Sequence, residues 1–146
     1  MGSLPDELLA AAMKGDVDSV KKLLKKGANA TPVLYAAVMG GYSDVVKTLL
    51  ENGADANAVD IHEYDHNWIT TTTTHVLYAA ARTGNLEMVM ALLENGADPN
   101  ASQTREPDNA YEKSALSVAE ANGFSKVAEV LKEAIESRHS SAVAPS

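Results

Sequence analysis

Two short stretches of this sequence occur twice with the same separation. The segment VLYAA occupies residues 33–37 and again 76–80, and LLENGAD occupies residues 49–55 and again 92–98. Each second copy lies 43 residues after the first, so one structural unit is written twice. Self-similarity at a fixed period is typical of repeat architectures, and it decides the class of fold before any single residue is interpreted.

Each unit reads as two short helices. Four alanine-rich or leucine-rich segments end in a glycine, and these glycines are Gly15, Gly41, Gly84 and Gly123. A second apolar pattern follows each glycine with spacings of three and four, as in Val46, Leu49 and Leu50, which places these residues on one helical face. The glycine supplies the left-handed conformation that ends a helix. Thr31 followed by Pro32 predicts an N-cap and a first helical position.

Four such helix pairs are enough to form one stable stack. A single pair cannot bury its apolar face, and about three repeats are needed before neighbours build a continuous core. The first helix of each pair is rich in alanine, as at residues 10–12 and 79–81, so neighbouring first helices can approach closely. The second helices carry the bulky leucine and valine. This asymmetry predicts a stack with one concave and one convex side.

The two central units resemble a known family. The runs from Thr31 to Ala58, TPVLYAAVMGGYSDVVKTLLENGADANA, and from Thr74 to Ala101, THVLYAAARTGNLEMVMALLENGADPNA, are similar to the ankyrin repeat. The signature of that family reads T-P-L-H-x-A-A-x-x-G-H, then a second helix, then L-L-x-x-G-A-D-x-N-A. The resemblance extends over residues 5 to about 135. It implies an all-α ankyrin-repeat solenoid of four helix-turn-helix units with extended loop or β-hairpin fingers, and it implies binding to another protein.

The repeats divide the chain into six parts. They are an N-terminus that is either disordered or added for expression (1–4), an N-terminal capping repeat (5–30), a second repeat with a long finger (31–73), a third repeat with an extended finger (74–112), a C-terminal capping repeat (113–136) and a disordered tail (137–146). The tail SRHSSAVAPS is rich in serine and alanine, a composition that provides little apolar surface to bury.

The spacing of the repeats is irregular. The ankyrin repeat is about 33 residues long, whereas the four glycines are separated by 26, 43 and 39 residues. The deficit falls between Ala30 and Thr31, so we expect no finger between the first two helix pairs. The excess falls in residues 58–74 and 101–113. Connections this long are uncommon in compact domains and are usually functional or disordered.

The two long fingers and the concave face hold the candidate contact residues. The first finger carries Ile61, Tyr64 and Trp68, the only tryptophan, among Asp60, Glu63 and Asp65. Buried aromatic residues dominate many binding interfaces. Its run ITTTTT suits either a β-strand or a low-complexity spacer. In the family the end of the first helix points into the concave groove, and Met39, Arg82 and Thr83 occupy that position here. Arg105 and Tyr111 are the candidates on the second finger.

Several alternatives remain open from the sequence. Trp68 could fold back and staple its finger instead of contacting a partner. The dense set Asp60, His62, Glu63, Asp65 and His66 has ligand types that hold Zn²⁺ or Ni²⁺, but a finger offers no preformed cage, and we expect neither a metal nor a cofactor. No catalytic motif is present, so we expect no enzyme. A stoichiometric inhibitor of an enzyme and a binder engineered on a natural scaffold are the other functions considered.

Composition limits the partners. The 146 residues carry a net charge of −8, with sixteen acidic against seven basic side chains after residue 30. This charge opposes binding to nucleic acid or anionic membranes and favours a protein with a basic surface. The chain has no cysteine, and we see no signal peptide or transmembrane segment. We therefore expect a monomeric cytoplasmic or nuclear scaffold or adaptor.

Overall fold

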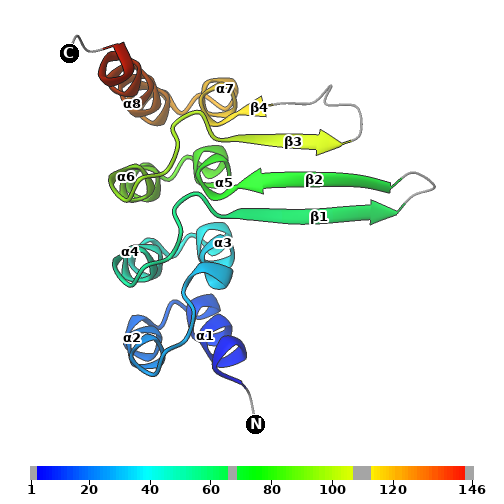
Figure 1. The fold of residues 1–146 in the computed structure, drawn as a ribbon, viewed down its shortest axis with the longest axis vertical. Helices are drawn as coiled ribbons and strands as arrows, with labels where there is room; N and C mark the ends of the chain where they lie inside the picture. The colour runs from blue at the N-terminus through cyan, green and yellow to red at the C-terminus, as the bar shows by residue number, and fades with distance from the viewer. Residues whose placement is uncertain (1–2, 66–68, 107–112, 144–146) are drawn as a thin grey trace.

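The protein is a single stack of four helix pairs with a sheet at one side (Figure 1). The computed structural model describes residues 3–65, 69–106 and 113–143, and it describes the side chains of these residues except at 62–65, 69–70 and 139–143. The helix pairs are α1 (Leu4–Met13) with α2 (Val17–Lys25), α3 (Thr31–Gly40) with α4 (Ser43–Glu51), α5 (Val76–Thr83) with α6 (Leu86–Glu94), and α7 (Ala115–Ala121) with α8 (Ser125–Val143).

The helices form two layers that bury different side chains. The inner layer holds α1, α3, α5 and α7, and each contacts the next along the stack. Buried alanines such as Ala37 and Ala80 allow these helices to pack closely. The outer layer holds α2, α4, α6 and α8, where larger residues such as Leu49, Leu92 and Leu131 are fully buried. The predicted helix phase is thereby confirmed, and the apolar faces of the repeats form one continuous core.

The repeat glycines end the inner helices as predicted. Gly41 and Gly84 adopt φ values of +78° and +75°, a region that residues with a Cβ occupy only with strain. The residue after the glycine then packs across to the neighbouring repeat in two cases. The ring of Tyr42 lies over Gly15, and the ring of Phe124 lies over Gly84. These glycines therefore also leave room for an aromatic ring from the next repeat.

The predicted N-cap at Thr31 is wrong. Helix α3 begins at Thr31 itself, and Ala30 stands at the N-cap position. The Thr31 hydroxyl instead accepts a hydrogen bond from the backbone N–H of Asp55 at 3.1 Å, in the turn that follows α4. The Thr31 N–H is satisfied by the side-chain oxygen of Asn29 at 3.2 Å. The hydroxyl thus joins the start of a repeat to its end.

The two long connections form one antiparallel sheet. Strands β1 (Val59–Asp65) and β2 (Ile69–His75) make the first finger, while β3 (Ser102–Glu106) and β4 (Lys113–Ser114) belong to the second. The strand order is β1-β2-β3-β4, so β2 and β3 join the two fingers. The ITTTTT run is a strand. As expected, no strand is present in residues 26–30, between the first two helix pairs.

The last helix is longer than the sequence indicated. Helix α8 extends to Val143, and it therefore includes residues 137–143, which we predicted to belong to a disordered tail. Its continuation has a contact to support it: an Nη1 atom of Arg138 lies 2.7 Å from Oδ1 of Asp98, in the turn after α6. The prediction failed because composition alone did not reveal this partner in the third repeat.

Candidate protein-binding surface

The fingers project from the inner layer of helices as a sheet (Figure 1). At the base of the sheet, part-buried polar contacts tie the two fingers to each other. Thr74 is buried, and its hydroxyl accepts a hydrogen bond from Nε2 of Gln103 at 2.9 Å. Nδ1 of His75 lies 2.9 Å from the carbonyl oxygen of Ser102, to which its N–H can donate. The backbone N–H of Val76, the first residue of α5, donates to the carbonyl oxygen of Ala58 at 3.1 Å. These contacts hold both fingers in a fixed direction.

The first half of β1, nearest the helices, exposes apolar side chains. Ile61 is 58% exposed and Val59 is 42% exposed. The register pairs Ile61 with Thr73, and Thr73 with Thr104 of the second finger. In an antiparallel sheet, residues directly opposite each other have their side chains on the same face. Ile61 therefore stands on one face beside two threonines, whereas Asp60, one residue earlier, is half-buried.

Only part of the predicted finger site is described. Tyr64, Glu63 and Asp65 lie in β1, but their side chains are outside the described residues, as is that of His62. Trp68 and Tyr111, with His66, lie outside the described backbone. Arg105 is exposed on β3, where its Cα partner is Thr72. The structure thus joins Arg105 to the sheet that carries Ile61.

On the inner helices the structure brings together two candidates from different repeats. An Nη2 atom of Arg82 lies 3.8 Å from the sulfur of Met39. Both side chains are exposed at the ends of their helices. Thr83 is also exposed, but its hydroxyl donates to the carbonyl oxygen of Ala80 at 2.8 Å. The hydroxyl therefore provides a hydrogen bond to a carbonyl group in the last turn of α5. Met39 and Arg82 therefore lie side by side across two repeats, and Thr83 follows Arg82 at the end of α5.

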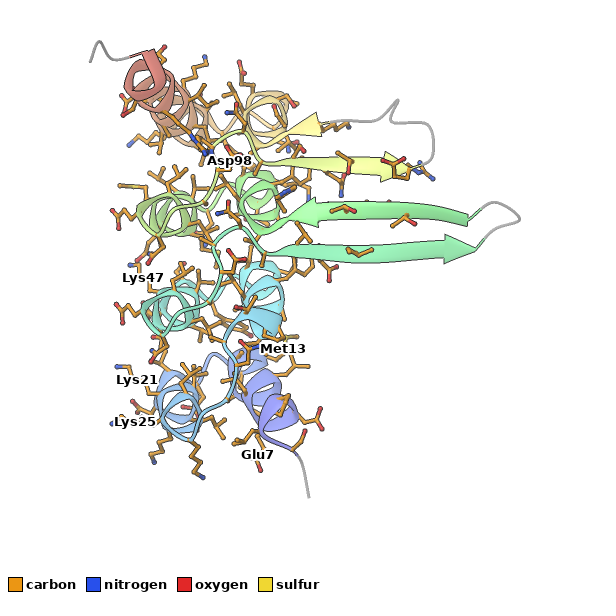
Figure 2. The ribbon with its side chains drawn as sticks, viewed as in Figure 1. Glu7, Met13, Lys21, Lys25, Lys47 and Asp98 are labelled. Atoms are coloured by element: carbon orange, nitrogen blue, oxygen red, sulfur yellow. The ribbon has the colours of Figure 1, made fainter. Side chains whose placement is uncertain are left out.

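The sequence interpretation missed two exposed apolar residues on α1. Leu9 and Met13 are about two-fifths and one-half exposed, and they lie one helical turn apart. Met13, Met39 and Arg82 each stand two residues before a repeat glycine. This shared position was the available signal, because equivalent positions of stacked repeats line one surface. Figure 2 shows Met13 at the inner-layer side of the stack.

Charge is distributed unevenly between the two layers. Helix α3 has no charged residue, and α5 has only Arg82. The outer helices carry most of the charge, and Figure 2 shows Lys21, Lys25 and Lys47 on the side away from the fingers. Lys47 pairs with Glu87, and hydrogen bonding to this carboxylate raises the pKa of Lys47. The inner surface is therefore almost neutral at α3 and α5, whereas α1 carries Asp6 and Glu7 and α7 carries Glu120.

A hollow lies between α4 and α6 of the outer layer. It has a volume of about 260 Å³ and is lined by Lys47, Glu51, Glu87, Met90, Ala91, Glu94 and Asn95. The lysine in it is already paired with a carboxylate, and the lining has no histidine, serine or cysteine that could act as a nucleophile with an adjacent base. Among the side chains that the structure describes, no three metal-ligating residues gather at one point. The side chains from His62 to His66, which the sequence analysis weighed as metal ligands, are outside that set.

Comparison with protein families agrees with the repeats seen in the stack. A family model for ankyrin repeats in three copies matches residues 7–60, and a model for the single ankyrin repeat matches residues 75–103. The two matches cover more than half of the chain. The protein belongs to the ankyrin-repeat family. The unmatched residues 61–74 fall within the first long finger, so the irregular part of this ankyrin-repeat protein is also the part that carries Ile61.

Family membership also gives a general function. Ankyrin repeats are generally modules for protein–protein interaction, and ankyrin-repeat proteins are typically not enzymes. A search of curated proteins found no match. Among the helices in the described ranges, none is both long enough and apolar enough to cross a membrane.

Proposed function

We propose that this ankyrin-repeat protein is a scaffold or adaptor that binds one partner protein through its inner helices and its sheet of fingers. The observation that carries the proposal is the joining of two enlarged fingers into one sheet beside the exposed ends of the inner helices. A surface held by a packed stack loses little conformational entropy on binding. The contact set comprises Ile61, Tyr64, Trp68, Met39, Arg82 and Arg105.

The chemistry of the proposed partner differs between the two parts of the surface. The first finger has an acidic sequence and favours a basic segment of the partner. The inner helices present Met13 and Met39, whose flexible thioether side chains adapt to apolar groups of varied shape. A partner that spans both parts would place a basic segment at the finger and an apolar segment against the inner layer.

The register suggests a clean way to test the finger. Asp60 and Thr74 are opposite each other in the sheet, so residues 61–73 can be replaced by Asn-Gly, which closes a two-residue hairpin. A second variant, for comparison, replaces residues 104–112, which include Arg105, by Asn-Gly between Gln103 and Lys113, which are also opposite each other. Both variants keep Thr74, His75, Ser102 and Gln103, the residues that join the bases of the two fingers.

The measurement is capture of proteins from cells of the source organism, followed by titration of the captured partner. We expect the full chain to retain a partner that the variant without residues 61–73 binds at least about thirtyfold more weakly, as for loss of a hot spot. The variant without residues 104–112, which lacks only Arg105 of the contact set, should lose less binding affinity. Equal binding by the full chain and both variants would remove the fingers from the proposal, and a full chain that retains no partner would contradict the proposal itself.

A further inference from the structure

A groove with basic side chains runs between α1 and α2. It has a volume of about 350 Å³. In its lining Ala11 and Leu23 are buried, whereas Lys14, Lys22 and Lys26 are exposed. The groove therefore has an apolar base and a basic rim.

This groove lies on the face of the first repeat that points away from the other three repeats. Figure 2 shows Glu7, which also lines it, at this end of the stack. The equivalent residues of the second repeat lie 26 positions later, and there α3 and α4 pack against α1 and α2. Val33 and Thr48 are buried in the second repeat and correspond to Glu7 and Lys22 of the groove. The groove is thus an open surface whose residue types do not suit packing of a further ankyrin repeat.

Capping of the stack explains why this face is polar but not why it is basic. Terminal repeats need a polar outer face for solubility. At the other end of the stack, Glu120 and Lys132 provide it with opposite charges 3.8 Å apart. At the groove, the ammonium groups of Lys14, Lys22 and Lys26 form no ion pair with any residue that the structure describes. Three positive charges therefore remain available to a ligand.

The acidic residues of the groove offset these lysines only in part. The Asp16 carboxylate accepts two hydrogen bonds from Ser19 as the N-cap of α2, and Glu7 lies in the first turn of α1. Negative charge at these positions stabilises the helix that it begins. Residues 14–26 hold five lysines against two aspartates, in a chain whose net charge is −8. This end of the stack is therefore basic although the protein is acidic.

We propose that the groove between α1 and α2 binds an acidic amphipathic helix of a second partner protein. The apolar row of that helix would lie against Ala11 and Leu23, and its carboxylates would pair with Lys14, Lys22 and Lys26. A helix laid into an apolar groove is a common mode of peptide recognition, and a pair of helices packs on the equivalent face of the second repeat. The inference goes beyond the proposed function, because it adds a contact surface separate from the fingers.

Other occupants fit the groove less well. The net charge of −8 opposes the approach of nucleic acid and of an anionic membrane, and a phosphate backbone has no apolar surface to place against Leu23. In a second copy of this chain, the end that would continue the stack carries Glu120 already paired with Lys132. A separate acidic protein is therefore the occupant that the charges favour.

A designed peptide tests the groove directly. The probe is a blocked helical peptide of about four turns, with a row of leucines at spacings of three and four and glutamates on both sides of the row. It is titrated into the full-length protein at physiological salt, and the backbone amides are followed by NMR. We expect shifts in α1 and α2 and none in α6 or β2. A peptide of the same composition in scrambled order has the charge but no apolar face, and it should bind at least about tenfold more weakly.

Two double variants with the same change in charge locate the site. Lys22→Glu with Lys26→Glu reverses two charges on the rim and should weaken binding of the peptide at least about tenfold. Lys21→Glu with Lys25→Glu changes the same helix outside the groove lining, and it should weaken binding less than about threefold, because salt screens charges that do not touch the peptide. Thermal unfolding followed by circular dichroism verifies that both variants fold.

The outcomes that would overturn the proposal are specific. Equal losses in the two double variants would show a diffuse attraction in place of a groove. Equal binding of the scrambled peptide, shifts confined to other elements, or tighter binding of a DNA duplex than of the peptide would also contradict it. The variant without residues 61–73 should bind the peptide as tightly as the full chain does, so failure of the groove and failure of the finger surface are distinguishable.

Discussion

The side-chain amide of Asn57 spans the turns of two successive repeats. Its Oδ1 accepts a hydrogen bond from the backbone N–H of Asp98 at 2.7 Å, and its Nδ2 donates to the carbonyl oxygen of Gly96 at 3.0 Å. Asp98 in turn pairs with Arg138 on α8. The turns that follow the outer helices are thus joined from the second repeat to the fourth by polar contacts, independently of the apolar core.

The first prediction concerns this connection between turns. Asn57→Ala should lower the free energy of unfolding by about 1 kcal/mol, because two hydrogen bonds are lost at an exposed site. Asn100 is the matched control: it is the equivalent residue one repeat later, and its side chain makes no hydrogen bond within the described part of the chain. Urea unfolding of both alanine variants measures the difference, and equal losses would show that the Asn57 contacts add nothing.

The second prediction separates backbone strain from steric contact at the repeat glycines. A Cβ at Gly41 would meet no atom within 4 Å, whereas a Cβ at Gly84 would lie 2.6 Å from the ring of Phe124. Gly41→Ala should therefore cost only the strain of a left-handed residue, about 1–2 kcal/mol.

Gly84→Ala carries the same strain and must also displace the Phe124 ring, so its thermal unfolding midpoint should fall further than that of Gly41→Ala. The double variant Gly84→Ala with Phe124→Ala checks the cause. If the ring is responsible, the change at Gly84 costs less in the Phe124→Ala background than in the original protein. Equal costs in both backgrounds would assign the whole effect to the backbone.

The sequence was sufficient for the helices because their signals are local. Each pair is specified by an apolar spacing of three and four and by a glycine within about twelve residues, so no distant contact is needed to predict it. The unusual lengths of the connections also predicted where fingers are present and where one is absent. These local signals did not predict that the two fingers pair with each other in one sheet.

The missing information is long-range. Thr73 and Thr104 are neighbours in the sheet, but their register depends on where the stack places each finger and leaves no periodic signal in either segment. The role of Thr31 was misread for a related reason, since its hydroxyl bonds to Asp55, at the end of the same repeat. The contact between Arg82 and Met39 was only partly predictable. Their shared position before the repeat glycines predicted that both lie on one surface, but not that they touch.

The third prediction is a pH dependence at the start of α2. The carboxylate of Asp16 accepts hydrogen bonds from the hydroxyl and the backbone N–H of Ser19, at 2.7 and 3.2 Å, and these bonds lower the pKa of Asp16 below its ordinary value of 3.8. A lowered pKa in the folded state means that the stabilisation is present above pH 3.8 and is lost as the pH falls through the folded pKa.

Asp16→Asn tests this, because asparagine also caps helices but does not titrate. The difference in stability between the original protein and the variant should shrink as the pH falls from 5 to 2, because protonation of Asp16 removes the charge that accepts these hydrogen bonds. Between pH 2 and pH 5 the free energy of unfolding of the original protein should rise by more than that of the variant. Urea unfolding at the two pH values measures both changes, and a difference between the proteins that is independent of pH would show that the charge of Asp16 has no part in capping α2.

The last prediction concerns Trp68, which lies outside the described residues. If Trp68 is presented to a partner, Trp68→Ala should change folding stability by no more than about 0.5 kcal/mol while binding weakens by about 2 kcal/mol, a factor near thirty. If Trp68 instead folds back onto its own finger, Trp68→Ala should mainly lower folding stability. Since it is the only tryptophan, quenching of its fluorescence by acrylamide reports its exposure in the free protein.

Neutralising the acidic residues of the same finger gives an independent measurement. Replacing Asp60, Glu63 and Asp65 by their amides should slow association with a basic partner and reduce the effect of salt on the association rate, because the long-range attraction is removed. The half-buried position of Asp60 makes it the one change expected to affect melting, so a variant with only Glu63 and Asp65 changed serves as the control. Unchanged binding in this variant and in Trp68→Ala would place the contact surface on the inner helices around Met39 and Arg82.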